Sequence, residues 1–371
     1  MCRPDLPNQA KFAASHFVAL LLKIRVSSVK ANVMDIQSKS RSGKIYGPVA
    51  FMGLARMLRR RAKALIKIFS GASQDQTKGF QCLDALVVEM VDRVQDAADI
   101  PGEVIGISSG FVDLDRMTTG FRPGDLIVLS SRPGIGKTAL ATNIAQHIAF
   151  SVGLPVAMFS LDMAASNLVK RIVGSVSSID LTHLRTGKLS DEEWPRLADA
   201  IEKLRNCDLH IDESMGLSAS ELSAKAHKLA VERGQLGLIV VDHLQLICHR
   251  EGGRVDRVNE VGEILRDLKT LASELKCPIL ILSQLTGRAA RRCDKRPMLA
   301  DLGDSVAIEH QADIIMFLDR DDNMGATEQT CIAELTIAKQ RNGPNGTVKL
   351  TFIRRLAKFE NPPSKQSVNS Q

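Results

Sequence analysis

From Gly106 onward, short runs of consecutive apolar residues alternate with longer stretches in which apolar residues recur at every third or fourth position. Continuous apolar runs are typical of strands buried on both faces, and the longer spacing is typical of amphipathic helices. The alternation predicts an α/β fold with a mainly parallel central sheet. The predicted strands are 126–130, 156–160, 209–211, 238–241 and 278–282, and the predicted helices lie near 138–150, 164–176, 190–206, 219–233 and 255–276.

Two of these helices have a start signal. Ser190 precedes Glu193 and Ser218 precedes Glu221, each with the spacing of a capping box. Both serines are therefore predicted to cap the helix that follows.

The C-terminal part of the chain is rich in predicted strands. The pattern favours strands at 314–318, 333–338 and 348–353, which predicts β-hairpins added to the edge of the sheet. Residues 362–371 combine Pro362 and Pro363 with Ser, Gln and Asn, so this tail is predicted to be disordered. The main domain is therefore expected to span residues 106–361.

The N-terminal part has a different pattern. Apolar residues recur at helical spacing over Gly79–Ala98, and Pro101 and Gly102 end the pattern, so 79–105 is predicted to hold a linker helix. Residues 1–78 form a basic, partly helical N-terminal extension, possibly disordered, with an amphipathic stretch at Phe51–Phe69. Two interpretations of that stretch stay open: a solvated helix with one charged face, or a helix that binds nucleic acid or a membrane surface.

The excess of positive charge is concentrated in this extension. Residues 1–78 carry 15 Lys and Arg against 3 acidic residues, a balance of +12, which leaves −5 for residues 79–371 out of the total of +7. The excess of positive charge is thus a property of the extension rather than of the α/β domain. A poorly ordered extension is favoured over an organellar transit peptide, although the composition resembles one.

Composition narrows the class of protein further. The 7 cysteines are widely spaced without a C-x-x-C pair, which argues against a disulfide framework or a zinc ribbon and favours a reducing, cytoplasmic setting. With one Tyr, one Trp and 12 Phe, stacking on bases is poorly supported, so contact with nucleic acid is expected to involve phosphates. No apolar run is long enough to span a membrane.

A phosphate-binding loop follows the first predicted strand. Gly134 and Gly136 allow backbone N–H groups to point inward around the β-phosphate of a nucleoside triphosphate. Lys137 is expected to reach the β- and γ-oxygens and Thr138 to place its hydroxyl on Mg²⁺. Ser131 occupies the position at which the strict motif has Gly. The predicted nucleotide-binding loop is Ser131, Arg132, Pro133, Gly134, Ile135, Gly136, Lys137 and Thr138.

Three polar residues are expected beside this loop. Asp242 follows four apolar residues, as in a Walker B motif, and is predicted to hold Mg²⁺ largely through water. Asp162 follows the strand 156–160 and is the candidate base that orients the attacking water, the alternative being that it only caps the following helix. Gln284 ends another strand and is a candidate sensor of the γ-phosphate, although a polar residue at a strand end is also common.

Together these residues resemble the C-terminal ATPase domain of DnaB-type hexameric replicative DNA helicases. The resemblance covers about Gly79 to Asn361, and its specificity comes from the order of several motifs. They are Thr119–Leu126, the phosphate-binding loop, Phe159–Met163, Arg185–Leu189, Val241–Leu246, Leu282–Leu285, Asp294–Pro297 and Lys339–Pro344.

The resemblance implies a RecA-like core, a homo-hexameric ring, ATP and Mg²⁺ as cofactors, and single-stranded DNA as a partner. It implies that Lys339 and Arg341 reach the nucleotide of the neighbouring subunit, where a cation stabilises developing charge. It places Arg171 at the nucleotide and the helix 79–98 on the adjacent subunit. Residues 1–78 do not resemble the family's helical, primase-contacting N-terminal domain, so contact with primase or a helicase loader is less expected.

Two positions depart from the family pattern. Asp162 stands where the family usually has Glu, one methylene longer, which is expected to slow hydrolysis. In the family's DNA-facing loop, here Asp301–Ile308, Gly303, Asp304 and Val306 replace the usual residues. DNA contact through that loop is therefore less expected. The cations Arg288, Arg291, Arg292, Lys295 and Arg296 are candidates to compensate through phosphates, and a solvated loop face explains them equally well.

The sequence therefore predicts an ATP-dependent DNA helicase motor that translocates on single-stranded DNA during DNA replication and hydrolyses ATP between subunits. The alternative is an ATP-binding, weakly hydrolysing helicase paralogue that acts as an accessory or DNA-binding ring protein. A RecA-like ATPase of the recombination or clock-protein type fits the motifs less well.

Overall fold

The computed structural model describes residues 83, 86, 87, 90, 91, 104–248, 257–285, 296–303, 305–320 and 330–363. The chain divides into two units, Met1–Leu86 and Val87–Gln371. Of the predicted linker helix, the described residues 83, 86, 87, 90 and 91 are helical and have exposed side chains. The predicted extension 1–78, its helix Phe51–Phe69 and residues 364–371 lie outside the described part.

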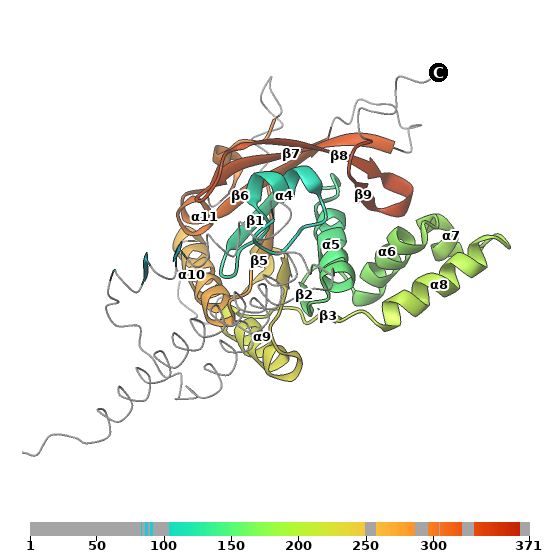
Figure 1. Ribbon diagram of the computed structural model, residues 1–371, viewed down its shortest axis with the longest axis horizontal. Helices are drawn as coiled ribbons and strands as arrows, with labels where there is room; N and C mark the ends of the chain where they lie inside the picture. The colour runs from blue at the N-terminus through green and yellow to red at the C-terminus, as the bar shows by residue number, and fades with distance from the viewer. Residues whose placement is uncertain are drawn as a thin grey trace, which may run out of the picture. The chain divides into compact units, whose positions relative to one another are not determined.

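The second unit is built on one sheet in the order β3-β2-β4-β5-β1-β6-β7-β8-β9 (Figure 1). Neighbouring strands from β3 to β6 are parallel, and β6 to β9 are antiparallel. This arrangement confirms the predicted RecA-like α/β fold with antiparallel C-terminal strands. The strands are β1 Leu126–Ser131, β2 Val156–Ser160, β3 Leu209–Asp212, β4 Leu238–Asp242, β5 Ile279–Gln284, β6 Ile314–Arg320, β7 Thr330–Gln340, β8 Gly346–Ile353 and β9 Lys358–Glu360.

Helices cover both faces of the sheet. Side chains of successive strand residues point to opposite faces, so Ile127 and Leu129 pack with helix α5 while Leu126 and Val128 pack with helices α9 and α10. The α6, α7 and α8 helices lie side by side in a separate lobe (Figure 1). The helices are α4 Val112–Thr118, α5 Lys137–His147, α6 Ala165–Ser177, α7 Leu181–Thr186, α8 Glu193–Arg205, α9 Ala219–Arg233, α10 Arg257–Leu275 and α11 Ser305–Gln311, with a π-helical turn at Ile148–Val152 and 3₁₀ turns at Leu244–Leu246, Leu299–Asp301 and Arg354–Leu356.

The two predicted caps have different outcomes. Ser218 forms the capping box, with its hydroxyl accepting from Glu221 N and the Glu221 carboxylate accepting from Ser218 N. The prediction for Ser190 is only half confirmed: the Glu193 carboxylate accepts from Ser190 N at 2.9 Å, but α8 begins at Glu193 with no side-chain cap. The reason is a backbone turn, Glu193 N to Ser190 O at 3.0 Å, that precedes the helix, while the Glu193 carboxylate also binds His183.

Some short elements were not predicted. They are α4, α7, α11 and β9, each between 3 and 7 residues long. Such segments carry too few residues for a periodic pattern to show. None of the described helices is long and apolar enough to cross a membrane.

Candidate functional site

Several of the predicted site residues meet at the carboxyl edge of the parallel strands. The strand register pairs Ser131, the last residue of β1, with Gln284, the last of β5. It also pairs Ser160, at the end of β2, with Asp242 at the end of β4. Asp162 lies two residues beyond β2, so these polar groups occupy one edge of the sheet.

The phosphate-binding loop connects β1 to α5 at this edge. Gly134 and Gly136 have φ values of +79° and +115°, which residues with a Cβ atom rarely adopt. Ser131 is still part of β1 and is buried, with its carbonyl accepting from Leu285 N at 3.2 Å. Its extended backbone explains why the first position of the motif does not need glycine here.

The C-terminal strands pack against the loop. A Cβ atom on Gly136 would lie 3.2 Å from the Phe359 ring, which stacks on Phe352 with centroids 4.4 Å apart. On the other side, the guanidinium of Arg132 pairs with Asp319 at 2.7 Å. The loop is therefore fixed between α5 and the strands β6, β8 and β9.

Lys137 begins α5 and points along the strand ends. Its Nζ donates to the carbonyl of Ser283 on β5 at 3.1 Å. Burial lowers the pKa of Lys137, while the nearby carboxylates Asp242 and Asp162 act in the opposite direction. The ammonium is thus held at the strand edge and surrounded by acidic groups.

Thr138 and Asp242 lie in direct contact. The Thr138 hydroxyl donates to Asp242 Oδ2 at 2.7 Å, and Asp242 is 3% exposed. A hydroxyl and a carboxylate side by side are oxygen ligands of the type that Mg²⁺ accepts together with water and phosphate. The pair therefore fits a magnesium ion at the end of β4.

Asp162 and Gln284 border the same edge. Asp162 is exposed, and its charge acts on both Lys137 and His243. Burial and then the charge of Lys137 lower the pKa of His243. Gln284 is also exposed, and its backbone N donates to Gln245 Oε1 at 3.4 Å. Arg171 is half-buried on α6.

Lys339 and Arg341 lie at the opposite edge of the sheet. Lys339 on β7 pairs in register with Ile315, near the start of β6, whereas the phosphate-binding loop follows the end of β1. A strand of six residues such as β1 spans about 20 Å. Within one chain these cations are therefore far from the other predicted site residues.

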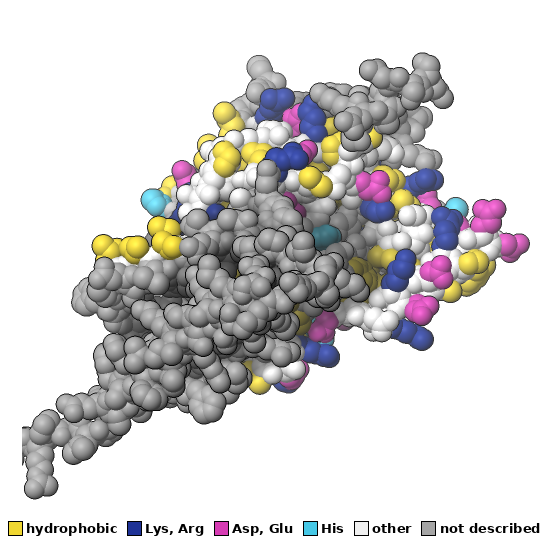
Figure 2. All heavy atoms as spheres, viewed as in Figure 1, with side chains coloured by type: hydrophobic (Ala, Val, Ile, Leu, Met, Phe, Trp, Pro, Cys, Tyr) yellow, Lys and Arg dark blue, Asp and Glu magenta, His cyan; other side chains and the backbone are white. Residues whose placement is uncertain are grey.

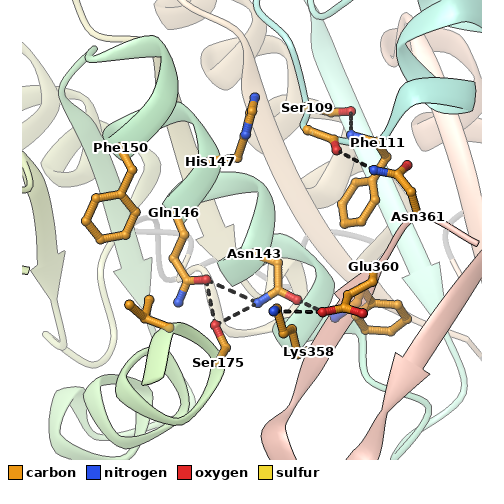
Figure 3. Close-up of a pocket in the computed structure, with 13 residues that line it drawn as sticks. Ser109, Phe111, Asn143, Gln146, His147, Phe150, Ser175, Lys358, Glu360 and Asn361 are labelled. Carbon is orange, nitrogen blue, oxygen red and sulfur yellow. Dashed lines mark hydrogen bonds and ion pairs between the residues drawn. The ribbon is translucent and has the colours of Figure 1, made fainter. Parts of the chain in front are cut away.

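Among the described residues, two cavities lie outside the strand edge that carries the loop. One, of about 490 Å³, lies in front of Lys339 and Arg341 and is lined also by Val306, Glu309 and His310. The other, of about 390 Å³, lies beside the later turns of α5 (Figure 3). The amides in the second cavity are engaged with one another and with the backbone, as in the bonds from Ser175 to Gln146 and from Asn361 to Gly110. Its lining also includes the charged side chains of Lys358 and Glu360, which pair with each other at 2.7 Å.

Sequence reasoning missed several contributors to the site. The carbonyl of Ser283, which accepts from Lys137, has no signal in the sequence because every residue has a carbonyl. Asp319 and Phe359 reach the loop from more than 180 residues away. Of the cations proposed to compensate in the DNA-facing loop, Arg296 is described and pairs with Glu334 at 3.5 Å; Asp304 and 288–295 lie outside the described residues.

The strand order, the loop and the Thr138–Asp242 pair define a P-loop nucleotide site on a RecA-like sheet. The DnaB-like helicase C terminal domain family matches residues 106–361. The chain belongs to this family.

Relatives of known name support this membership. Replicative DNA helicase DnaC of Bacillus subtilis (strain 168) is 43% identical over 295 residues, which are 79% of this chain and 65% of that protein. Replicative DNA helicase DnaB of Geobacillus stearothermophilus is 43% identical over 296 residues, 80% of this chain and 65% of that protein. The chain thus spans just under two thirds of the length of these relatives.

Solved structures with a similar fold support the same family. A solved ATPase domain has a TM-score of 0.71 and 32% identity, and the match covers 76% of this chain and 100% of that one. The structure of a DnaB-like replicative helicase and its interactions with primase has a TM-score of 0.69 and 30% identity, covering 84% of this chain and 76% of that one.

Proposed function

We propose that the protein is an ATP-dependent DNA helicase motor that translocates on single-stranded DNA during DNA replication. The observation that carries this proposal is the meeting of Lys137, Thr138, Asp242 and Asp162 at one strand edge, in a chain of this family. The names of the curated relatives, both replicative DNA helicases, favour a motor over a weakly hydrolysing accessory ring protein.

The proposed chemistry at the strand edge is hydrolysis of ATP. The backbone of residues 131–138 surrounds the β-phosphate, and the ammonium of Lys137 binds the β- and γ-oxygens. Thr138 through its hydroxyl and Asp242 largely through water would hold Mg²⁺, which would neutralise charge on those oxygens. Asp162 accepts a proton from the attacking water, and Gln284 contacts the γ-phosphate.

We also propose that the active site is completed by a second copy of the chain in a homo-hexameric ring. Lys339 and Arg341 lie about one strand length from their own phosphate-binding loop, so they are placed to serve another subunit's nucleotide rather than their own. An arginine at the γ-phosphate stabilises the charge that develops there. Arg171 is the candidate contact within the same chain.

The remaining parts have proposed roles as well. Residues 106–361 form the ATPase domain, 79–105 the linker that packs on an adjacent subunit, 1–78 a basic extension and 362–371 a tail. A primase or a helicase loader is a less expected partner, because residues 1–78 do not resemble the primase-contacting domain of the family; interactions with primase are described for one structural relative.

Steady-state ATP hydrolysis, with and without single-stranded DNA, tests the proposal. We expect turnover to rise when DNA is added and to fall by about 100-fold or more in Lys137→Ala, because the ammonium that stabilises the phosphates is gone. Lys228→Ala is the matched control, because Lys228 is exposed on α9, on the face of the sheet away from α5. Turnover of the unmodified protein no higher than that of Lys137→Ala would falsify the proposal.

A further inference from the structure

Asp313 lies between α11 and β6 and is only 5% exposed. Its backbone N donates to Leu126 O at 2.9 Å, and its Oδ2 accepts from Leu126 N at 2.8 Å. Two hydrogen bonds therefore fix this residue to the first residue of β1. Its carboxylate has a defined position relative to the central sheet.

The same residue holds Arg341 at two points. The backbone carbonyl of Asp313 accepts from Arg341 N at 2.9 Å, and Asp313 Oδ1 lies 3.3 Å from Arg341 Nη1. A second guanidinium nitrogen donates to His310 O, in the last turn of α11, at 2.6 Å. The planar guanidinium is thus fixed in direction by a carboxylate and a helix carbonyl.

A second cation keeps the carboxylate neutralised. Lys269 on α10 places its Nζ 2.5 Å from Asp313 Oδ2 and 2.7 Å from Gly124 O. A buried carboxylate that loses its only partner carries a large desolvation penalty. Because Lys269 stays paired, the guanidinium can exchange Asp313 for a phosphate without leaving an isolated buried charge.

The guanidinium also has open space before it. The Arg341 side chain is 45% exposed and lines the cavity of about 490 Å³ with Lys339, Glu309 and His310. Lys339 is held beside it, since its Nζ donates to the carbonyls of Glu309 and Ala312. Both cations are therefore anchored by the segment that ends in Asp313 and line the same open cavity.

We propose that Asp313 is the positioning residue for Arg341: it holds the guanidinium in the direction of an adjacent subunit's nucleotide, with Lys269 as the permanent counter-charge. This inference rests on the proposed function, in which Arg341 serves a neighbouring site. Asp313 itself touches no substrate and acts only through Arg341.

Mixed-ring complementation tests this role. In Asp313→Asn the amide oxygen still accepts from Leu126 N, but the charge that orients Arg341 is lost. We expect kcat to fall about 10- to 100-fold with little change in the KM for ATP, because the variant's own phosphate-binding loop is unaltered. Mixing with Lys137→Ala protein should restore activity, because the Lys137→Ala subunits supply a correctly held Arg341 to intact loops. Asp208→Asn, at a half-buried ion pair with His210 and Arg233, is the control and should keep full activity.

The arms of the experiment separate this inference from the proposed function. Arg341→Ala mixed with Lys137→Ala must regain activity if sites are shared between subunits. If neither mixture regains activity, shared sites are contradicted, and so is the role of Asp313 that depends on them. If Arg341→Ala is rescued but Asp313→Asn is not, or if Asp313→Asn is fully active alone, Asp313 has no positioning role. Should Asp313→Asn fail to assemble, Asp313→Glu, which keeps the charge but displaces it, is used in the same mixture with the same expectation.

Discussion

Asp162 is the candidate base of the proposed site, at a position where the sequence resemblance leads us to expect Glu. It lies two residues beyond β2, is exposed, and is close enough to Lys137 to act on its pKa. Its carboxylate is in the right region to orient a water, but its side chain is one methylene shorter than that of Glu. A displacement of about 1 Å at such a group lowers the rate considerably.

We therefore expect Asp162→Glu to raise kcat by up to about tenfold, because the longer side chain brings the base closer to the water. The measurement is steady-state ATP turnover at saturating ATP and Mg²⁺. Asp191→Glu, an equal change at an exposed residue before α8, should have no effect. Unchanged turnover in Asp162→Glu would remove Asp162 from the role of base.

At the scale of secondary structure, hydrogen bonds at helix starts contribute measurable stability. Ser218 closes a capping box at the start of α9, whereas Ser190 leaves α8 without a side-chain cap. Ser218→Ala should therefore lower the free energy of unfolding by about 1 kcal/mol. Ser190→Ala, the matched control, should change it by less than about 0.5 kcal/mol.

Thermal and urea unfolding of both variants measure this difference, and ATP turnover should be unchanged in each. Equal destabilisation by the two substitutions, or none by Ser218→Ala, would contradict the assignment of the cap. Because α9 packs on the face of the sheet away from α5, the result would concern the stability of this helix and not the proposed nucleotide site.

The elements were largely predictable from sequence because buried parallel strands and amphipathic helices have strong patterns. The strand 156–160 has the predicted limits, and 219–233 is the predicted helix. The pair Ser190 and Glu193 has the same spacing as Ser218 and Glu221, but only the carboxylate half of the box forms, because Glu193 N bonds to Ser190 O. Local spacing alone does not decide between the two outcomes.

The candidate site was predictable only where its residues form a local sequence motif next to a predicted strand. The loop 131–138 and Asp242 follow strands, so their common edge could be inferred from topology. The contacts that fix the site, such as Asp319 with Arg132 and Asp313 with Arg341, join residues whose proximity depends on how β6 packs. No local pattern encodes such contacts.

At the scale of the whole molecule, charge gives little support for DNA binding by itself. The excess of basic residues belongs to residues 1–78, and residues 79–371 carry −5. On the face in view, basic and acidic side chains are interspersed over the lobe of α6, α7 and α8 (Figure 2). DNA contact in the proposed ring therefore depends on locally placed cations rather than on net charge.

The arrangement of the two sheet edges leads to the proposal of a ring. One edge of the chain carries the phosphate-binding loop, and the other carries Lys339 and Arg341. A contact between two different surfaces of identical chains is repeated from subunit to subunit and closes into a ring when the rotation permits. Hydrolysis would then depend on contact between neighbours.

Strand separation on a forked DNA duplex with a single-stranded tail tests the central claim most directly. The account predicts that the protein separates the strands only with ATP and Mg²⁺, and that Lys137→Ala and Arg341→Ala do not separate them. ATP hydrolysis by the unmodified protein without any strand separation would contradict a helicase motor and favour the accessory ring protein instead.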